Sequence, residues 1–498
     1  MKRTAQDILN FVEDNDVKFA KLTFCDIFGN QKNVSLFASE LPRAFAEGVS
    51  FDGSSIAGFM NVEESDLVLW PDPDTATVLP WRPTEGRVIR MYCDITLPNG
   101  KPFEGNCRGY LQSVIKRARA MGLVCNVGCE CEFYLFETDE HGSPTRIPLD
   151  IGGYFDIPPL DKGENIRREI CFAIEEMGLH PEHSHHESGH GQNEVCFRYT
   201  LKSADNLNTF KSTVKAIAAR NGLFASFMPK PLANQPGSGL HVNVSLLRDG
   251  KNLFDGAFTP DSEAGHFVAG ILAHARELTA FCNPVPNSYA RLGANEAPLY
   301  VSWSRQNRSQ LVRLPSAHGE FCRVELRGPD PAGNPYLVIG LILAAGLDGI
   351  EHSLPLPEAV NRNLFHPSAA AGLDSLPRTL REAITVAGQS EFISRELPVA
   401  LMNKYFEYQT QLCHDAEGAP DTESWEREDK HLAQLPDHLI LREYVGRPAL
   451  RPPCPCARRE NFSVRHTPTA GWGHPALRPV RKLHRKLSGR EGSLWQKP

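Results

Sequence analysis

Two glutamates, Glu130 and Glu132, interrupt a mainly apolar segment at residues 125–136, and this restricts how the chain can fold. The pattern predicts a core strand, in which residues two apart project from the same face. The two carboxylates therefore share one face, while Phe133 and Leu135 lie on the other. Adjacent carboxylates in a core repel each other and lose their hydration, and this is unfavourable unless a cation between them compensates. The segment is therefore either a metal-binding core strand or an edge strand with solvated charges.

Two further segments offer carboxylates to the same cation. Glu187 and Glu194 stand seven residues apart around a glycine-rich turn, so both can fold back to one point. Glu325 lies between Arg323 and Arg327 at period two, which lines one side of a strand with an arginine, a carboxylate and an arginine. Guanidinium groups beside divalent metals suit a nucleoside triphosphate, because the guanidinium groups and the metal ions both neutralise the charge of phosphate oxygens.

A glycine loop leads into a predicted strand at residues 239–247, on which His241, Asn243 and Ser245 share one face. Oxygen-rich ligands with a single imidazole suit Mg²⁺ or Mn²⁺ better than zinc. Five glutamates and one histidine are enough for two such ions. The sequence contains no glycine-rich phosphate loop of the GxxxxGK[ST] or GxGxxG type. An ATP site would therefore have to be built on the sheet and the metals.

Composition narrows the function classes. The chain has 498 residues and a formal net charge of −7, which argues against non-specific nucleic-acid binding. The most apolar stretch, residues 336–350, is shorter than the roughly 20 residues that span a bilayer. It predicts a buried helix, and the N-terminus lacks the apolar core of a secretory signal. Thirteen scattered cysteines are typical of reduced thiols. We therefore expect a cytoplasmic protein that binds neither membrane nor nucleic acid.

The pattern along the chain predicts three parts. Residues 15–98 alternate at period two between turn residues and predict a small β-rich domain, with residues 51–59 as a glycine- and serine-rich loop. Residues 105–445 alternate between strand and helix patterns and predict a large α+β catalytic domain. Residues 446–498 are basic and proline-rich, which predicts a disordered tail. The main elements expected in the large domain are helices at 108–121, 166–177, 204–220 and 265–278, and strands at 125–136, 194–199, 239–247 and 323–327.

Seven motifs in order make the chain, over residues 17–408, resemble class I glutamine synthetase. In this sequence they are Phe51-Asp-Gly-Ser-Ser-Ile, Glu130-Cys-Glu132-Phe, Gly152-Gly-Tyr-Phe155, His185-His-Glu187 with Gly191-Gln-Asn-Glu194, Lys230-Pro with Gly237-Ser-Gly-Leu-His241, Asn287-Ser-Tyr-Ala-Arg291 with Glu296-Ala-Pro298, and Asn307-Arg308-Ser with Arg323-Val-Glu325-Leu-Arg327-Gly-Pro-Asp330. A single motif of this kind is weak evidence, whereas seven in order are specific.

The resemblance implies an α+β fold, with an N-terminal β-grasp domain and a large catalytic domain built on a curved antiparallel sheet with flanking helices. It implies ATP-dependent ligation of ammonia to the γ-carboxylate of L-glutamate. The products would be L-glutamine, ADP and phosphate, formed through γ-glutamyl phosphate. The expected partners are L-glutamate, ammonium, ATP and further copies of the chain, in a dodecamer of two hexameric rings.

The resemblance also implies roles for individual residues. One Mg²⁺ or Mn²⁺ site would be formed by Glu132, Glu187 and Glu194, and the other by Glu130, His241 and Glu325. Glutamate would be bound by Gly237, Arg291, Glu296 and Arg327, and ATP by Glu182, Asn243, Ser245, Arg308, Arg313 and Arg323. The catalytic residues would be Asp52, Glu296, Arg308 and Arg327. Asp52 would come from a neighbouring subunit to bind ammonium and accept its proton, and Glu296 would cover the site.

Two alternatives remain open at this point. A ligase of the same family could join glutamate to a polyamine or another amine, but its ammonium pocket should lose carboxylates. Here Asp52, Glu187 and Glu296 are all present. A structural protein that has lost catalysis would have no reason to keep six metal ligands, and all six are present.

Overall fold

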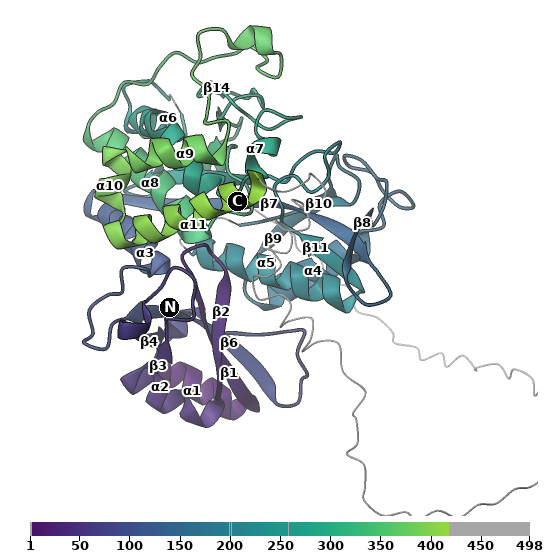
Figure 1. Ribbon diagram of the computed structural model, residues 1–498, viewed down its shortest axis with the longest axis vertical. Helices are drawn as coiled ribbons and strands as arrows, with labels where there is room; N and C mark the ends of the chain where they lie inside the picture. The colour runs from purple at the N-terminus through teal and green to yellow at the C-terminus, as the bar shows by residue number, and fades with distance from the viewer. Residues whose placement is uncertain (1, 199, 201, 257, 418–498) are drawn as a thin grey trace, which may run out of the picture. The chain divides into compact units, whose positions relative to one another are not determined.

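The alternation near the N-terminus forms a six-stranded sheet in the computed structural model, which describes residues 2–198, 200, 202–256 and 258–417 (Figure 1). Its strand order is β2-β1-β6-β4-β3, with β5 paired to β6. Strand β1 pairs antiparallel with β2 and parallel with β6. The elements of this domain are α1 (Ala5–Asp14), β1 (Val17–Cys25), β2 (Gln31–Phe37), α2 (Leu41–Glu47), β3 (Val49–Asp52), β4 (Asp66–Pro71), β5 (Thr77–Val78) and β6 (Arg87–Thr96).

The turn between β1 and β2 contacts the large domain. Gly29 adopts a positive φ of 90°, and a Cβ at this position would lie 2.7 Å from the Cα of Asn334. Asn334 in turn donates its side-chain amide to the carbonyl of Ile27 at 2.9 Å. One predicted loop needs correction, because the first two residues of 51–59 belong to β3, where Phe51 pairs with Leu67 of β4.

The large domain is built on a ten-stranded sheet of order β14-β15-β16-β12-β7-β10-β9, in which β8 and β11 also pair with β7 and β13 pairs with β12. All of these pairs are antiparallel except β14 with β15. The strands are β7 (Leu123–Thr138), β8 (Pro144–Pro148), β9 (Pro181–His186), β10 (Gln192–Phe197), β11 (Leu223–Ser226), β12 (Leu240–Arg248), β13 (Lys251–Asn252), β14 (Trp303–Arg305), β15 (Val312–Leu314) and β16 (Val324–Leu326).

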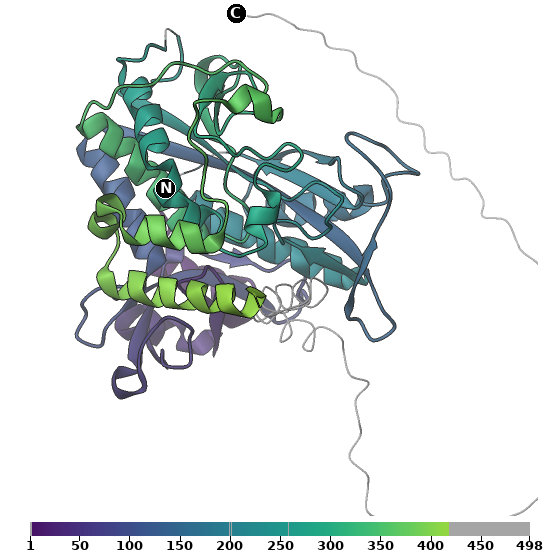
Figure 2. The same ribbon diagram turned by 45° about the horizontal axis from the view of Figure 1, so that its top comes forward.

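Helices cover this sheet and separate it from the small domain. Figures 1 and 2 show α6, α8, α9 and α11 gathered at one end, away from β8 to β10. The helices are α3 (Cys107–Ala120), α4 (Glu164–Glu176), α5 (Ser203–Arg220), α6 (Glu263–Cys282), α7 (Ser288–Arg291), α8 (Pro335–Glu351), α9 (Leu380–Gly388), α10 (Glu391–Glu396) and α11 (Val399–Glu417). The α+β architecture expected from the sequence is confirmed.

The large-domain elements predicted from the sequence are confirmed to within a few residues. The four predicted helices are α3, α4, α5 and α6, and the four predicted strands are β7, β10, β12 and β16. The apolar stretch at 336–350 is the buried helix α8. No described helix is long and apolar enough to cross a membrane. The predicted basic tail, residues 446–498, lies outside the described residues.

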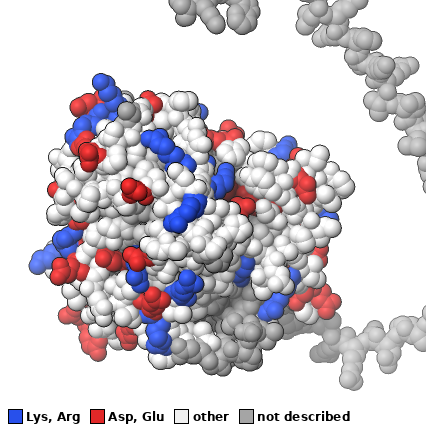
Figure 3. Space-filling view, turned by 90° about the horizontal axis from the view of Figure 1, so that it is seen from above, with Lys and Arg blue, Asp and Glu red and all other residues white. Residues whose placement is uncertain are grey.

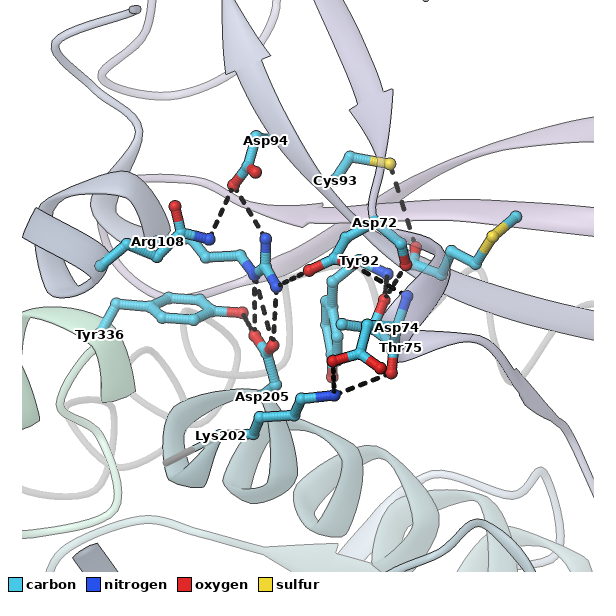
Figure 4. Close-up of polar contacts among 12 residues, drawn as sticks. Asp72, Asp74, Thr75, Tyr92, Cys93, Asp94, Arg108, Lys202, Asp205 and Tyr336 are labelled. Carbon is cyan, nitrogen blue, oxygen red and sulfur yellow. Dashed lines mark hydrogen bonds and ion pairs between the residues drawn. The ribbon is translucent and has the colours of Figure 1, made fainter. Parts of the chain in front are cut away.

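A largely buried arginine, Arg108, joins the two domains (Figure 4). Arg108, on α3, donates to Asp72 at 2.6 Å and to Asp94 at 2.8 Å, both in the small domain. It also pairs with Asp205 of α5 at 3.1 Å, and the hydroxyl of Tyr336 on α8 donates to the same carboxylate at 2.7 Å. One guanidinium thus connects β6, α5 and α8 and fixes the small domain on the helices behind the large sheet.

Charge is mixed on the face of the molecule in Figure 3, where lysine and arginine side chains alternate with acidic ones.

In the core, the side chains of β7 that alternate with the two glutamates are buried. Cys129, Cys131, Phe133 and Leu135 are each at most 1% exposed. The two thiols therefore belong to the hydrophobic core, and Glu130 and Glu132 project from the other face of β7.

Candidate active site

Strand register gathers five of the six predicted metal ligands around β7, and the sixth, Glu187, follows the end of β9. Glu130 of β7 lies opposite His241 of β12, and Glu132 lies opposite Glu194 of β10. Because each pair shares one face of the sheet, the four side chains converge. Glu325, on β16 at the far side of β12, joins the same face opposite Asn243.

The distances confirm that these side chains form one cluster. The His241 Nδ1 atom lies 3.4 Å from Glu130 Oε2 and 3.9 Å from Glu325 Oε1, and its Nε2 atom lies 4.0 Å from Glu132 Oε1. Glu130, Glu194 and His241 each offer a ligand atom, and these three atoms lie within 4.8 Å of one another. The imidazole is therefore at the centre of the acidic residues.

The carboxylates of this cluster perturb one another. Burial raises the pKa of Glu194 well above its ordinary value, and the neighbouring charges of Glu130, Glu132 and Glu187 raise it further. Burial also raises the pKa of Glu132. For Glu130, burial is outweighed by the hydrogen bond and charge of His241 and by the charge of Arg323, and its pKa is about 2. Such crowded carboxylates are stabilised by a cation.

The donor set fits hard divalent cations. It consists of carboxylate oxygens around a single imidazole, which matches the preference of Mg²⁺ and Mn²⁺. The repulsion that raises the pKa of Glu194 is the part of this charge pattern that a bound cation would relieve. The chemistry and spacing of these residues thus agree with the metal binding expected of them.

Two arginines hold Glu325 from opposite sides. Arg313 Nη1 lies 2.6 Å from Glu325 Oε2, and Arg327 Nε lies 3.1 Å from Glu325 Oε1. The Arg327 side chain is buried, and its Nη1 atom has no hydrogen-bond partner among the described residues. A buried donor without a partner is costly, and the oxygen of an anionic ligand would satisfy it.

On the β12 side, hydrogen bonds tie Asn243 into the cluster. Its Nδ2 atom donates to Glu130 Oε1 at 3.1 Å, and Arg323 Nε donates to its Oδ1 atom at 3.0 Å. The Ser245 hydroxyl, by contrast, donates to the carbonyl of Cys322 at 2.8 Å. Of these two predicted ATP ligands, Asn243 therefore contacts the acidic cluster, whereas the Ser245 hydroxyl bonds to the protein backbone.

The glycine loop before β12 packs tightly against a buried arginine. Arg291 donates to the carbonyls of Gly328 at 2.8 Å and Arg327 at 3.2 Å. A Cβ at Gly237 would lie 2.4 Å from the carbonyl oxygen of Pro229 and 2.8 Å from Arg291 Cγ. Only glycine fits there, so the backbone of the loop packs against the aliphatic part of the Arg291 side chain.

Three predicted residues, apart from Asp52, lie at the surface. Glu182 is exposed and pairs with Arg198 at 3.8 Å. Arg308 and Glu296 are exposed in their loops, and the charges of both act on the Tyr154 hydroxyl, as does that of Glu187. Burial is the main cause of the raised pKa of Tyr154. Arg308, Glu296 and Glu187 therefore all lie within electrostatic range of the Tyr154 hydroxyl.

Asp52 is the predicted residue that the single chain does not bring to the cluster. It ends β3 in the small domain and accepts hydrogen bonds from the backbone and hydroxyl of Ser54 at 2.8 and 2.7 Å. Both bonds lower its pKa, so the exposed side chain is a carboxylate.

Sequence reasoning missed two polar residues of the site. Gln192 donates through Nε2 to Glu132 Oε2 at 2.9 Å and to the carbonyl of Gly237 at 3.2 Å, so it connects a metal ligand to the glycine loop. His185 lies 2.8 Å from Glu187 through its Nε2 atom. Both belong to the quoted motifs, and the period-two spacing of Gln192 from Glu194 was the available signal.

Comparison with protein families agrees, over most of the chain, with the resemblance to glutamine synthetase. Residues 16–98 match the family model described as "Glutamine synthetase, beta-Grasp domain", and residues 104–428 match "Glutamine synthetase, catalytic domain". The chain belongs to the glutamine synthetase family. The β-grasp and catalytic folds implied by the resemblance are thereby confirmed.

Individual relatives cover nearly the whole family region. A glutamine synthetase of Clostridium saccharobutylicum is 47% identical over 410 residues, which is 80% of this chain and 92% of the relative. A glutamine synthetase of Staphylococcus aureus (strain COL) is 42% identical over 453 residues, 86% of this chain and 98% of the relative.

Solved structures agree in fold. A structure described as "GmaS/ADP complex-Conformation 1" has 30% sequence identity and a TM-score of 0.76, and the match covers 85% of this chain and 99% of the other. A Plasmodium falciparum glutamine synthetase solved by cryo-electron microscopy has a TM-score of 0.75 at 24% identity, with coverage of 86% and 99%. At that identity the second likeness concerns the fold alone.

Proposed function

We propose that this protein ligates ammonia to the γ-carboxylate of L-glutamate at the expense of ATP, giving L-glutamine, ADP and phosphate. Membership of the glutamine synthetase family, with relatives of that name at 42 and 47% identity, supports the reaction. The observation that carries the proposal is the convergence of Glu130, Glu194 and His241 within 4.8 Å.

Six residues form the proposed metal sites. Glu132, Glu187 and Glu194 would hold one ion, and Glu130, His241 and Glu325 the other. Bound Mg²⁺ or Mn²⁺ would neutralise phosphate oxygens and orient ATP for transfer. The arginines Arg308, Arg313 and Arg323 would bind the phosphates with Glu182, Asn243 and Ser245 as further nucleotide contacts. The ADP complex of the GmaS structure supports a nucleotide site in this fold.

Glutamate would be held at the glycine loop. Arg291, the backbone of Gly237 and the unpartnered Nη1 atom of Arg327 are the proposed contacts for its carboxylates. A carboxylate does not react with ammonia at neutral pH, because oxide is a poor leaving group. In the proposed first step the γ-carboxylate oxygen attacks the γ-phosphorus and ADP leaves. Arg308 and Arg327 stabilise the charge that spreads over the phosphoryl oxygens.

Ammonia attacks the resulting γ-glutamyl phosphate in the second step, and phosphate leaves. Ammonium has no lone pair until it loses a proton, so a carboxylate must first attract the cation and then accept the proton. Asp52 of a neighbouring subunit, Glu187 and Glu296 are proposed for this pocket, with Asp52 as the base. The exposed Glu296 would cover the site and exclude water.

This role for Asp52 requires an oligomer, because within one chain its side chain bonds only to Ser54 among the described residues. We propose a dodecamer of two hexameric rings, with a β-grasp domain at 15–98, a catalytic domain at 105–445 and a basic tail at 446–498. We also propose a cytoplasmic location, which the free thiols of all described cysteines support.

The alternative is a γ-glutamyl-amine ligase of the same family. The identity to relatives named glutamine synthetase favours ammonia. The test is glutamate-dependent phosphate release from ATP with ammonium, methylamine, putrescine and ethanolamine in parallel. We expect a strong preference for ammonium. A preference for any organic amine would replace the proposal by the alternative.

A further inference from the structure

A second group of possible metal ligands lies on the edge hairpin formed by β9 and β10. His183 and His185 stand two residues apart on β9 and share a face, and Glu194 of β10 lies directly opposite His185. Each of the three offers one ligand atom, and these atoms lie within 4.8 Å of one another. This group differs in chemistry from the acidic cluster, because two of its three ligands are imidazoles.

The hydrogen bonds of His185 leave one ring nitrogen available. Its Nε2 atom lies 2.8 Å from Glu187 Oε1, and an ionised carboxylate can only accept, so Nε2 carries the proton. The Nδ1 atom is buried and has no hydrogen-bond partner among the described residues. Its lone pair is therefore free for a metal. A histidine that donates one N–H to a carboxylate and ligates through the other nitrogen is the usual arrangement in metal sites.

Neighbouring side chains hold two of the three members, His185 and Glu194, in place. The rings of Phe155 and Tyr154 contact His185 edge-on, with centroids 4.8 and 5.6 Å away. Cys196 lies opposite His183 in the strand register, and its buried thiol donates to Glu194 Oε1 at 3.0 Å. The imidazole of His185 and the carboxylate of Glu194 are thus oriented before any ion binds.

We propose that His183, His185 and Glu194 form a site for a Zn²⁺-type transition-metal ion, separate in its ligands from the Mg²⁺ or Mn²⁺ cluster except for Glu194. Two histidines and one glutamate are a set that Zn²⁺ favours, and imidazole ligands select it over Mg²⁺. Because Glu194 also belongs to the group with Glu130 and His241, an ion bound here competes for that carboxylate. Zn²⁺ at this site therefore inhibits the ligase, whereas Mg²⁺ does not occupy it.

The test compares His183→Val with wild type and with a matched control, His141→Val. His183 is exposed, so its replacement leaves the core intact, and His141 is a surface histidine whose side chain is 79% exposed. Zn²⁺ affinity is measured on the full-length protein by competition with a chromophoric chelator, in excess Mg²⁺. We expect wild type and the control to bind their tightest Zn²⁺ ion with the same affinity. The tightest Zn²⁺ ion of His183→Val should bind at least about tenfold more weakly. Equal affinity in all three proteins would overturn the proposal.

Two further readouts separate this site from other thiols and carboxylates. Anomalous scattering at the zinc edge should give a peak bonded to the side chains of both His183 and His185, and a peak elsewhere alone would overturn the assignment. With Mg²⁺ as the only metal, His183→Val should turn over like wild type, and it should need about tenfold more Zn²⁺ for half-inhibition. Zn²⁺ binding is independent of turnover, so it remains measurable even if the protein is not an ammonia ligase.

Discussion

Replacing Glu194 by glutamine should stabilise the metal-free protein while it weakens metal binding. Glu194 and Glu130 have carboxylate oxygens within 4.8 Å of each other. At that separation Coulomb's law gives about 3 kcal/mol of repulsion at an effective dielectric constant of about 20, and about 1 kcal/mol in water. The substitution removes this repulsion and keeps an oxygen that can accept from the Cys196 thiol. We therefore expect the free energy of unfolding of the metal-free protein to rise by about 1–3 kcal/mol at pH 7.

The pH dependence of stability follows from the same carboxylate. Its pKa is raised in the folded protein, so the folded state binds a proton more tightly than the unfolded state. The free energy of unfolding should therefore fall as the pH rises from 4.5, the ordinary pKa of glutamate, through the raised pKa of Glu194 in the folded protein. This loss should be absent from Glu194→Gln.

Urea denaturation in a chelator, repeated in saturating Mg²⁺, measures both effects. The control is Glu137→Gln, which makes the same change at an exposed position on β7 and should alter neither quantity. Mg²⁺ should stabilise wild type and the control but Glu194→Gln much less, since a ligand that binds only the folded state stabilises it by an amount that grows with the logarithm of its concentration divided by its Kd. A Glu194→Gln protein no more stable than wild type in chelator would refute the electrostatic reasoning.

Three shorter predictions follow from single contacts. Gly237→Ala should raise the KM for glutamate at least about tenfold, because its Cβ would overlap the Pro229 carbonyl; an unchanged KM would contradict a role for this loop. Arg327→Lys should lower kcat at least about tenfold with little change in the KM for ATP, since lysine cannot bridge Glu325 and a ligand oxygen. His186→Ala should lower the free energy of unfolding by about 3–5 kcal/mol, because it leaves buried Asp150 without its ion-pair partner at 2.8 Å. Urea denaturation measures this loss, and a smaller loss would contradict the prediction.

The acidic face of β7 could be predicted because strand periodicity depends only on local sequence. Glu130 and Glu132 do project together, opposite a buried face, as their spacing indicates. The cross-strand register could not be predicted, because it depends on contacts between segments more than a hundred residues apart. That register pairs Glu130 with His241, and it decides which carboxylates meet.

Other features of the site depend on side-chain contacts that periodicity does not determine. Ser245 shares a face with His241, yet its hydroxyl bonds to the Cys322 carbonyl of the neighbouring segment. Conversely, the two-residue spacing of His183 and His185 is visible in the sequence but does not by itself indicate a metal site. The strand register is also needed, because it places Glu194 opposite His185. Asp52 illustrates a further limit, since its proposed partner lies in another copy of the chain.

The central claim is that an acyl phosphate forms on glutamate before ammonia is added, and oxygen transfer measures this directly. L-Glutamate labelled with ¹⁸O in its γ-carboxylate is incubated with the protein, ATP, Mg²⁺ and ammonium, and the released phosphate is analysed by mass. Our mechanism predicts that each phosphate carries one oxygen from glutamate, because the bond that breaks in the second step joins that oxygen to carbon. Phosphate without the label would contradict it, since ATP would then have been hydrolysed by water.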